Sequence, residues 1–137
     1  MNIYQSKYST LWGTTYKEVI KSAHREHESI KRRNPRRQPY VRSQYFAKDK
    51  VFLKLFWDHL SQKRQSDRSR RARLYRCGLD LIRHTSCEPV TITERTQPHI
   101  LLHKFAGKTA DGALFYVQIK ENRKTDRKDL ISIFPGN

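Results

Sequence analysis

The chain has 137 residues, of which 29 are Lys or Arg and 13 are Asp or Glu, and its formal net charge at pH 7 is +16. This length predicts a single domain over residues 1–137, and the charge predicts a polyanionic partner, with nucleic acid favoured over an acidic protein or an anionic membrane. Because no apolar run approaches the roughly 18 residues of a membrane span and no signal peptide opens the chain, we expect a cytoplasmic protein without membrane attachment.

Residues 1–85 are expected to form a helical, basic half of the domain. After an N-terminal arm, Thr15 and Glu18 match a capping box, in which each side chain bonds the backbone of the other residue. Apolar residues then recur at helical spacing, which predicts a helix over residues 16–32. The arm is expected to dock through its aromatic residues, which are Tyr4, Tyr8 and Trp12.

Residues 31–42 hold two prolines and six basic residues, which predicts a loop that becomes ordered when it binds a polyanion. Two further helices are expected, over residues 49–63 and 66–85, and His59 belongs to the apolar stripe of the first. Like charges repel along the start of the second helix, and a polyanion would relieve this strain; an ordinary solvated face is the alternative. The predicted nucleic-acid contacts in these segments are Arg32, Arg33, Arg36, Arg37, Arg68, Arg70, Arg71 and Arg73.

Residues 86–137 are expected to form a small antiparallel sheet that carries the functional site. Three alternating runs, at residues 99–106, 113–121 and 129–134, predict a meander, and residues 90–93 predict an added edge strand. The predicted fold class is therefore α+β, with three N-terminal helices packed on one face of a C-terminal antiparallel sheet of three to four strands.

Alternation assigns the side chains of the meander to two faces, of which one is the expected core. Turns centred near Thr109 and Thr125 would gather the polar groups of the other face around one phosphate. The expected neighbours there are His103 with Tyr116, Gln118 with Ser132, and Lys120 with His99. The expected core face holds Ile100, Leu102, Phe115, Val117, Ile119, Ile131 and Ile133.

This set of groups suits cleavage of RNA without a metal, which needs a base, an acid and positive charge on the phosphorane. Histidine can serve in either proton-transfer role, so His103 is the first candidate and His99 the second. The predicted charge-stabilising residue is Lys120, with Arg95 or Lys104 as the alternatives, and both of these are also predicted nucleic-acid contacts. The predicted phosphate-orienting residues are Ser132, Gln118 and Tyr116. The alternative for His103 is a polar bystander on a half-exposed sheet.

No cofactor or metal is expected. His24 and His27 share a helix face, but the sequence offers no third ligand beside them. Cys77 and Cys87 form no CxxC pair and no even-numbered framework, which argues against a zinc site or a structural disulfide. Cys77 is instead expected to be a small buried residue.

Helices followed by a small antiparallel meander on a compact basic chain resemble the RelE and barnase-like ribonuclease toxins, a superfamily that includes EndoU and colicin-type tRNases and is called BECR. The resemblance covers mainly residues 90–135. Its motifs are His-Lys-Phe at 103–105, Gln-Ile-Lys at 118–120 and Ser-Ile-Phe at 132–134, which look like the catalytic positions of that superfamily. A counterpart of the glutamate base of barnase would be Glu94 or Glu121.

The resemblance implies an endoribonuclease toxin that cuts tRNA, mRNA or ribosome-bound RNA to a 2′,3′-cyclic phosphate, together with an inhibitory acidic antitoxin protein. Two other functions stay open. One is a non-catalytic RNA- or DNA-binding accessory protein that contacts phosphates through residues 31–42 and the last predicted helix. The other is an adaptor whose half-apolar sheet face docks another protein while its charge steers the encounter.

Overall fold

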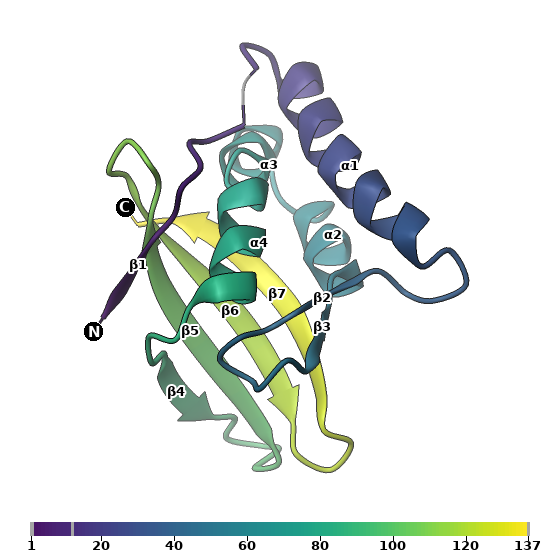
Figure 1. Ribbon diagram of the computed structural model, residues 1–137, viewed down its shortest axis with the longest axis vertical. Coiled ribbons are helices and arrows are strands. Elements are labelled where there is room, and N and C mark those ends of the chain that lie inside the picture. Colours follow the sequence, from purple (N-terminus) through teal and green to yellow (C-terminus); the bar gives the residue numbers. More distant parts are fainter. Residues whose placement is uncertain (1, 12, 137) are drawn as a thin grey trace.

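The computed structural model describes residues 2–11 and 13–136, so Trp12 lies outside the described residues (Figure 1). In this part of the chain, seven strands form one curled mixed sheet, three of the four helices pack against one of its faces, and the helix over residues 16–33 lies mainly against the other helices (Figure 1). The elements in chain order are β1 (Ile3–Gln5), α1 (Tyr16–Arg33), β2 (Tyr40–Arg42), β3 (Lys50–Phe52), α2 (Lys54–Leu60), α3 (Gln65–Ala72), α4 (Tyr75–His84), β4 (Val90–Thr93), β5 (Ile100–Lys108), β6 (Leu114–Asn122) and β7 (Arg127–Pro135).

The centre of the sheet is the antiparallel meander β5-β6-β7, and β4 pairs with β5 in antiparallel orientation. Strands from the N-terminal half extend both edges, with β1 parallel to β5, β3 parallel to β7, and β2 beyond β3. The prediction of three N-terminal helices on a small C-terminal antiparallel sheet is therefore wrong, although the class is α+β. Strands of three residues are too short to show a period in the sequence, which explains why the sequence does not predict β1, β2 and β3.

The first helix follows its prediction closely. The hydroxyl of Thr15 accepts a hydrogen bond from the backbone N–H of Glu18, as a capping box requires. The reciprocal bond differs, because the carboxylate of Glu18 accepts from the N–H of Thr14 at 2.8 Å. The expected loop after this helix ends in strand β2.

The other two predicted helices are wrong in part. Residues 50–52 form β3 instead of the start of a helix, and α2 begins only at Lys54. The helix expected over residues 66–85 is broken into α3 and α4. The break coincides with the N-terminal arm, because the N–H of Leu11 donates to the carbonyl of Arg73 at 2.8 Å.

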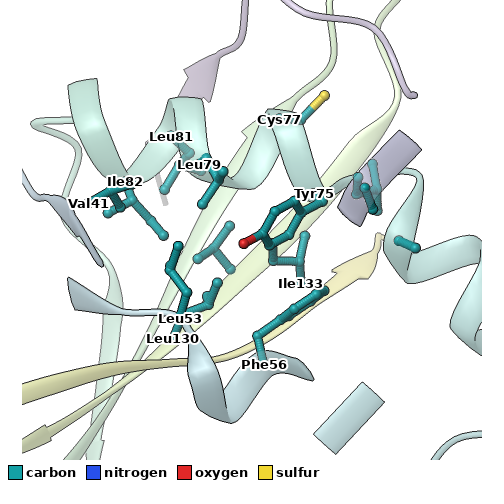
Figure 2. Packing of buried hydrophobic residues seen from close by; sticks show 14 of the residues in the cluster. Val41, Leu53, Phe56, Tyr75, Cys77, Leu79, Leu81, Ile82, Leu130 and Ile133 are labelled. Atoms are coloured by element: carbon teal, nitrogen blue, oxygen red, sulfur yellow. The ribbon is translucent and has the colours of Figure 1, made fainter. Parts of the chain in front are cut away.

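The core lies between the helices and the covered face of β5, β6 and β7, and Tyr75 of α4 lies within it (Figure 2). Helix α4 approaches β7 closely because Gly78 has no side chain, and a Cβ at that position would collide with Ile133. Cys77 is fully buried, as predicted, and burial raises the pKa of its thiol to about 11.

An aromatic cluster joins α1 to the helices α2 and α4. The ring of His24 stacks on Trp57 with centroids 4.4 Å apart, and Nδ1 of His27 lies 3.0 Å from the hydroxyl of Tyr75. Burial lowers the pKa of His27 below its ordinary value of 6.5, because it disfavours the charged imidazolium. His24 and His27, which share a helix face but have no third metal ligand in the sequence, therefore pack against residues of the neighbouring helices.

Candidate functional site

The register of the meander divides the predicted catalytic residues between the two faces of the sheet. In the β5-β6 pair, His103 lies opposite Ile119 and Lys120 lies opposite Leu102. Ile119 is three positions beyond the expected partner, Tyr116, and an odd shift turns every side chain of β5 to the other face. The predicted convergence of His103 with Lys120 and Ser132 is therefore wrong.

The shift follows from the turn between β5 and β6. The pairing of Lys108 with Leu114 leaves residues 109–113 in the turn and centres it on Asp111 instead of Thr109. The N–H of Thr109 donates to the carbonyl of Ala113 at 2.8 Å, which closes this five-residue turn. His99 lies before β5, and its carbonyl accepts from the N–H of Arg123 at the β6-β7 turn, so it is not the neighbour of Lys120.

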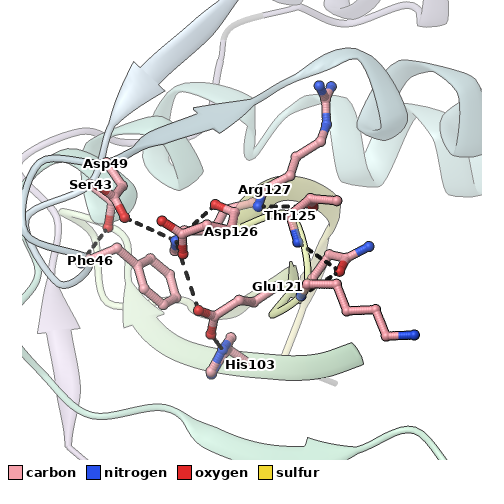
Figure 3. Close-up of polar contacts among 11 residues, drawn as sticks. Ser43, Phe46, Asp49, His103, Glu121, Thr125, Asp126 and Arg127 are labelled. Carbon is pink, nitrogen blue, oxygen red and sulfur yellow. Dashed lines mark hydrogen bonds and ion pairs between the residues drawn. The ribbon is translucent and has the colours of Figure 1, made fainter. Parts of the chain in front are cut away.

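His103 is buried in a polar network on the covered face, with 5 % of its surface exposed (Figure 3). Its Nδ1 lies 2.8 Å from the hydroxyl of Thr91, and its Nε2 lies 2.8 Å from a carboxylate oxygen of Glu121. The ring of Phe46 packs against it edge-on, with centroids 5.1 Å apart. These contacts link β4, β5 and β6 to the loop between β2 and β3, and they engage both ring nitrogens of the imidazole.

The network continues to Lys128 of β7, whose side chain is 3 % exposed. Burial disfavours its charged form, but hydrogen bonds to Asp49 at 2.9 Å and Asp126 at 3.0 Å outweigh burial and raise the pKa of the ammonium. Glu121 lies 3.8 Å from the same ammonium, so three carboxylates surround one buried cation. Ion pairs and hydrogen bonds of Lys128 therefore stabilise this end of the sheet, where the helices supply no apolar cover.

The other predicted residues lie on the face that the helices leave uncovered, here called the open face. Gln118 and Ser132 pair across β6 and β7, as predicted. Tyr116 and Lys120 lie on the same side of β6, two residues to either side of Gln118. Lys104 of β5 joins them, with its ammonium 5.0 Å from the centroid of the Tyr116 ring.

A hollow of about 330 Å³ opens where the turn between α2 and α3 meets β6 and β7. Strand β3 pairs only with Lys128 and Asp129 of β7, which leaves the rest of that edge for the two helices. Of the described residues that line the hollow, none is acidic and three carry basic or imidazole groups. The lining consists of Phe56, His59, Leu60, Gln62, Lys63, Arg71, Gln118, Ile131, Ser132 and Phe134.

Arg71 of α3 reaches the edge of the sheet and joins the helices to the open face. Its Nη1 donates to the hydroxyl of Ser132 at 2.6 Å, and its Nε pairs with Asp67 at 3.1 Å. The guanidinium lies 5.5 Å from the centroid of the Phe134 ring. Since both ends of the group are held, Arg71 is fixed at the wall of the hollow before any ligand arrives.

The sequence does not predict His59, Gln62 and Lys63 as site residues. His59 stands in the apolar stripe of α2, between Phe56 and Leu60, and this pattern favours a packing role. The only sequence signal for a site here was the imidazole of His59 at the end of that stripe, followed four residues later by Lys63. The sequence alone gives no reason for this turn to meet β7.

The remaining predicted arginines lie mostly on the surface. The guanidinium of Arg68 lies 5.2 Å from the centroid of the Tyr16 ring, and Arg73 is half-buried. Six of the arginines that the sequence predicts as nucleic-acid contacts are exposed. They are Arg32, Arg33, Arg36, Arg37, Arg70 and Arg95.

Comparisons with protein-family models, with curated proteins and with solved structures find no significant match for this chain. The resemblance to the BECR ribonucleases therefore stays a prediction. None of the helices in the described part of the chain is long and apolar enough to cross a membrane. Within residues 2–11 and 13–136, no three His, Cys, Asp or Glu side chains are grouped so that they could hold a metal ion.

The buried cation at Lys128 yields a stability prediction. Lys128→Met leaves Asp49, Asp126 and Glu121 facing one another without their shared counter-ion, so we expect it to lower the free energy of unfolding by roughly 2 kcal/mol or more. This is below the usual cost of breaking a buried pair because two of the carboxylates reach solvent. Urea unfolding monitored by circular dichroism measures the change. The exposed neighbour variant Lys124→Met is the control, and equal stability of the two variants would contradict the role given to Lys128.

Proposed function

We propose that this protein binds RNA on its open face and cleaves it in the hollow between α2, α3 and β7 without a metal. The observation that carries the proposal is the lining of that hollow, where His59, Lys63 and Arg71 accompany Ser132 and Gln118. Imidazole, ammonium, guanidinium, hydroxyl and amide are the groups that the reaction requires, and no carboxylate among the described lining residues opposes an anion.

Arg71 and Ser132 form the phosphate-binding part of the site. A guanidinium presents its donors as a fork that matches two oxygens of a phosphate. Because Asp67 and Ser132 already hold Arg71 in position, little conformational freedom is lost when a phosphate binds. Gln118 pairs with Ser132 across the strands and adds amide donors beside that phosphate.

The rings next to the hollow supply a surface for a base. Tyr116 and Phe134 lie with centroids 5.5 Å apart and planes inclined by 36°. Lys104 and Arg71 lie over these rings. Aromatic side chains beside cations on an open sheet are a common means of holding the bases of RNA, because the rings stack and the cations meet the phosphates.

The proposed reaction begins when the 2′-hydroxyl of the ribose attacks the adjacent phosphorus. His59 accepts the proton of that hydroxyl as the new P–O2′ bond forms. The P–O5′ bond breaks, and the ammonium of Lys63 donates a proton to the departing 5′ oxygen. Arg71 stabilises the charge that develops on the phosphorane. The products are a 2′,3′-cyclic phosphate and a 5′-hydroxyl, and no further reactant is consumed.

The proposal keeps the cytoplasmic location that is expected from the sequence. The resemblance to ribonuclease toxins adds an acidic antitoxin as a candidate inhibitor, and tRNA, mRNA or ribosome-bound RNA as candidate targets. An acidic protein would be attracted by the same positive field as RNA and would compete for the open face.

We expect His59→Gln to lower the rate of RNA cleavage by about a hundredfold or more, because it removes the proposed proton acceptor while keeping a polar side chain of similar length. Total RNA is incubated with the purified protein in the presence of EDTA, and the ends of the fragments are analysed for cyclic phosphates. His84→Gln, an exposed histidine on α4, is the control and should cut at the wild-type rate. Cleavage by the His59 variant at the wild-type rate would remove the proposed mechanism.

A non-catalytic RNA- or DNA-binding accessory protein is the second candidate, and the exposed arginines at the end of α1 favour it. They lie outside the hollow, so phosphate contacts there would not serve catalysis directly.

Binding of a fluorescent RNA at several salt concentrations tests this second candidate. Reversing Arg36 and Arg37 to Glu is expected to weaken binding. It should also make the slope of log affinity against log salt shallower by about 0.7 for each phosphate that the variant no longer neutralises. If the protein cuts no RNA and this pair carries most of the affinity, the accessory function is favoured. If the pair has no effect on affinity, that function is contradicted.

A further inference from the structure

We infer that the β2-β3 hairpin carries a second base-binding platform on the open face, and that the RNA substrate is an unpaired strand spanning both platforms. The inference rests on the proposed function, because it extends the path of the RNA away from the hollow between α2, α3 and β7. It concerns the substrate class and not the chemical step.

Alternation in the hairpin turns its aromatic and basic residues to the open face. Val41 and Val51 are buried in the core, so their neighbours along each strand point the other way. Phe52 pairs with Asp129 of β7, and Asp129 pairs with Lys120 of β6. The open face therefore continues from β6 and β7 onto the hairpin.

The hairpin repeats the pattern of rings and cations found at Tyr116 and Phe134. Tyr40 and Phe52 are direct partners across the strands, with ring centroids 6.1 Å apart in edge contact. Arg42 and Lys50 lie 5.6 Å and 5.0 Å from the centroid of the Tyr40 ring. The guanidinium of Arg127 lies 4.1 Å from the centroid of the Phe52 ring. A base can stack on the tyrosine ring or on the plane of a guanidinium.

The space beside these rings is lined by cations that can contact a phosphate group. A hollow of about 490 Å³ is lined by Arg42, Lys50 and Arg127 together with Asp49 and Asp126. Both carboxylates accept hydrogen bonds from the ammonium of the buried Lys128, which offsets part of their charge. Arg127 is paired with Asp129 at 3.2 Å, whereas Arg42 and Lys50 form no ion pair among the described residues. These two cations can therefore meet an anion such as a phosphate group.

The spacing of the platforms sets the length of the RNA. Phe52 lies opposite Asp129, five residues before Phe134 on β7, which corresponds to roughly 17 Å at about 3.3 Å per residue with one strand of lateral offset. Stacked neighbouring bases are only about 3.4 Å apart. The two platforms therefore take bases separated by several nucleotides, and Ser132, which lies between them on β7, meets the intervening phosphates.

Only an unpaired strand can use both platforms. Stacking on a side chain needs a free base face, which a duplex covers with its neighbouring pairs. RNA loops, bulges and single-stranded segments are therefore the inferred substrate class.

The test compares a single-stranded RNA of about ten nucleotides, a duplex of equal length and a dinucleotide by fluorescence anisotropy. The Tyr40→Leu, Phe52→Leu double variant keeps apolar volume but removes the rings. We expect it to bind the single strand roughly 5- to 150-fold more weakly, the range typical of losing one stacked base, and to bind the duplex and the dinucleotide as the wild type does. If the double variant does not fold, the single variant Tyr40→Leu replaces it, and the same selective loss is expected.

Equal affinity of the variants and the wild type for the single strand would overturn the inference, and so would an equal loss for single strand and duplex. Selective loss in a protein that cuts no RNA would support the second platform while removing the catalytic proposal. If the protein cleaves RNA but the hairpin variants bind the single strand as the wild type does, the catalytic proposal is supported and the second platform is ruled out. Binding of an acidic peptide at the hairpin, with no affinity for RNA, would contradict both.

Discussion

The five-residue turn between β5 and β6 is the constraint on which the arrangement of both sheet faces depends. Thr109 is fully buried there, and its hydroxyl accepts a hydrogen bond from the N–H of Ala113 at 2.9 Å. Gly112 has a φ of +94°, a left-handed conformation that side-chain-bearing residues rarely adopt. Together they fix the pairing of Lys108 with Leu114. This register places His103 on the covered face and its neighbour Lys104 on the open face.

The two faces consequently carry different kinds of side chains. The covered face buries the apolar residues of the meander under the helices, and its far end is completed by the network of His103, Glu121 and Lys128. The open face carries rings and cations that no helix covers. Arg71 connects the two sides, because it belongs to a helix of the covered face but bonds to Ser132. The positive charge of the chain therefore acts at a surface already shaped by the fold.

The sequence predicts the elements with strong patterns and fails where the outcome depends on distant contacts. The long alternating runs of β5, β6 and β7 and the capped start of α1 are readily found, and the predicted pairing of Gln118 with Ser132 is correct. The predicted register of β5 is wrong, because a shift of three positions in the pairing is invisible to alternation but reverses a face. The position of His59 in the wall of the hollow also could not be predicted, since it depends on where the turn after α2 meets β7.

The most direct test of this account is ultraviolet crosslinking of single-stranded RNA to the protein, followed by mass spectrometry of the linked peptides. The account predicts crosslinks at Tyr116, Phe134 and Tyr40, the rings of the open face, because stacked bases react with the side chains that they touch. Crosslinks confined to the loop after α1, with none on β6 or β7, would contradict it.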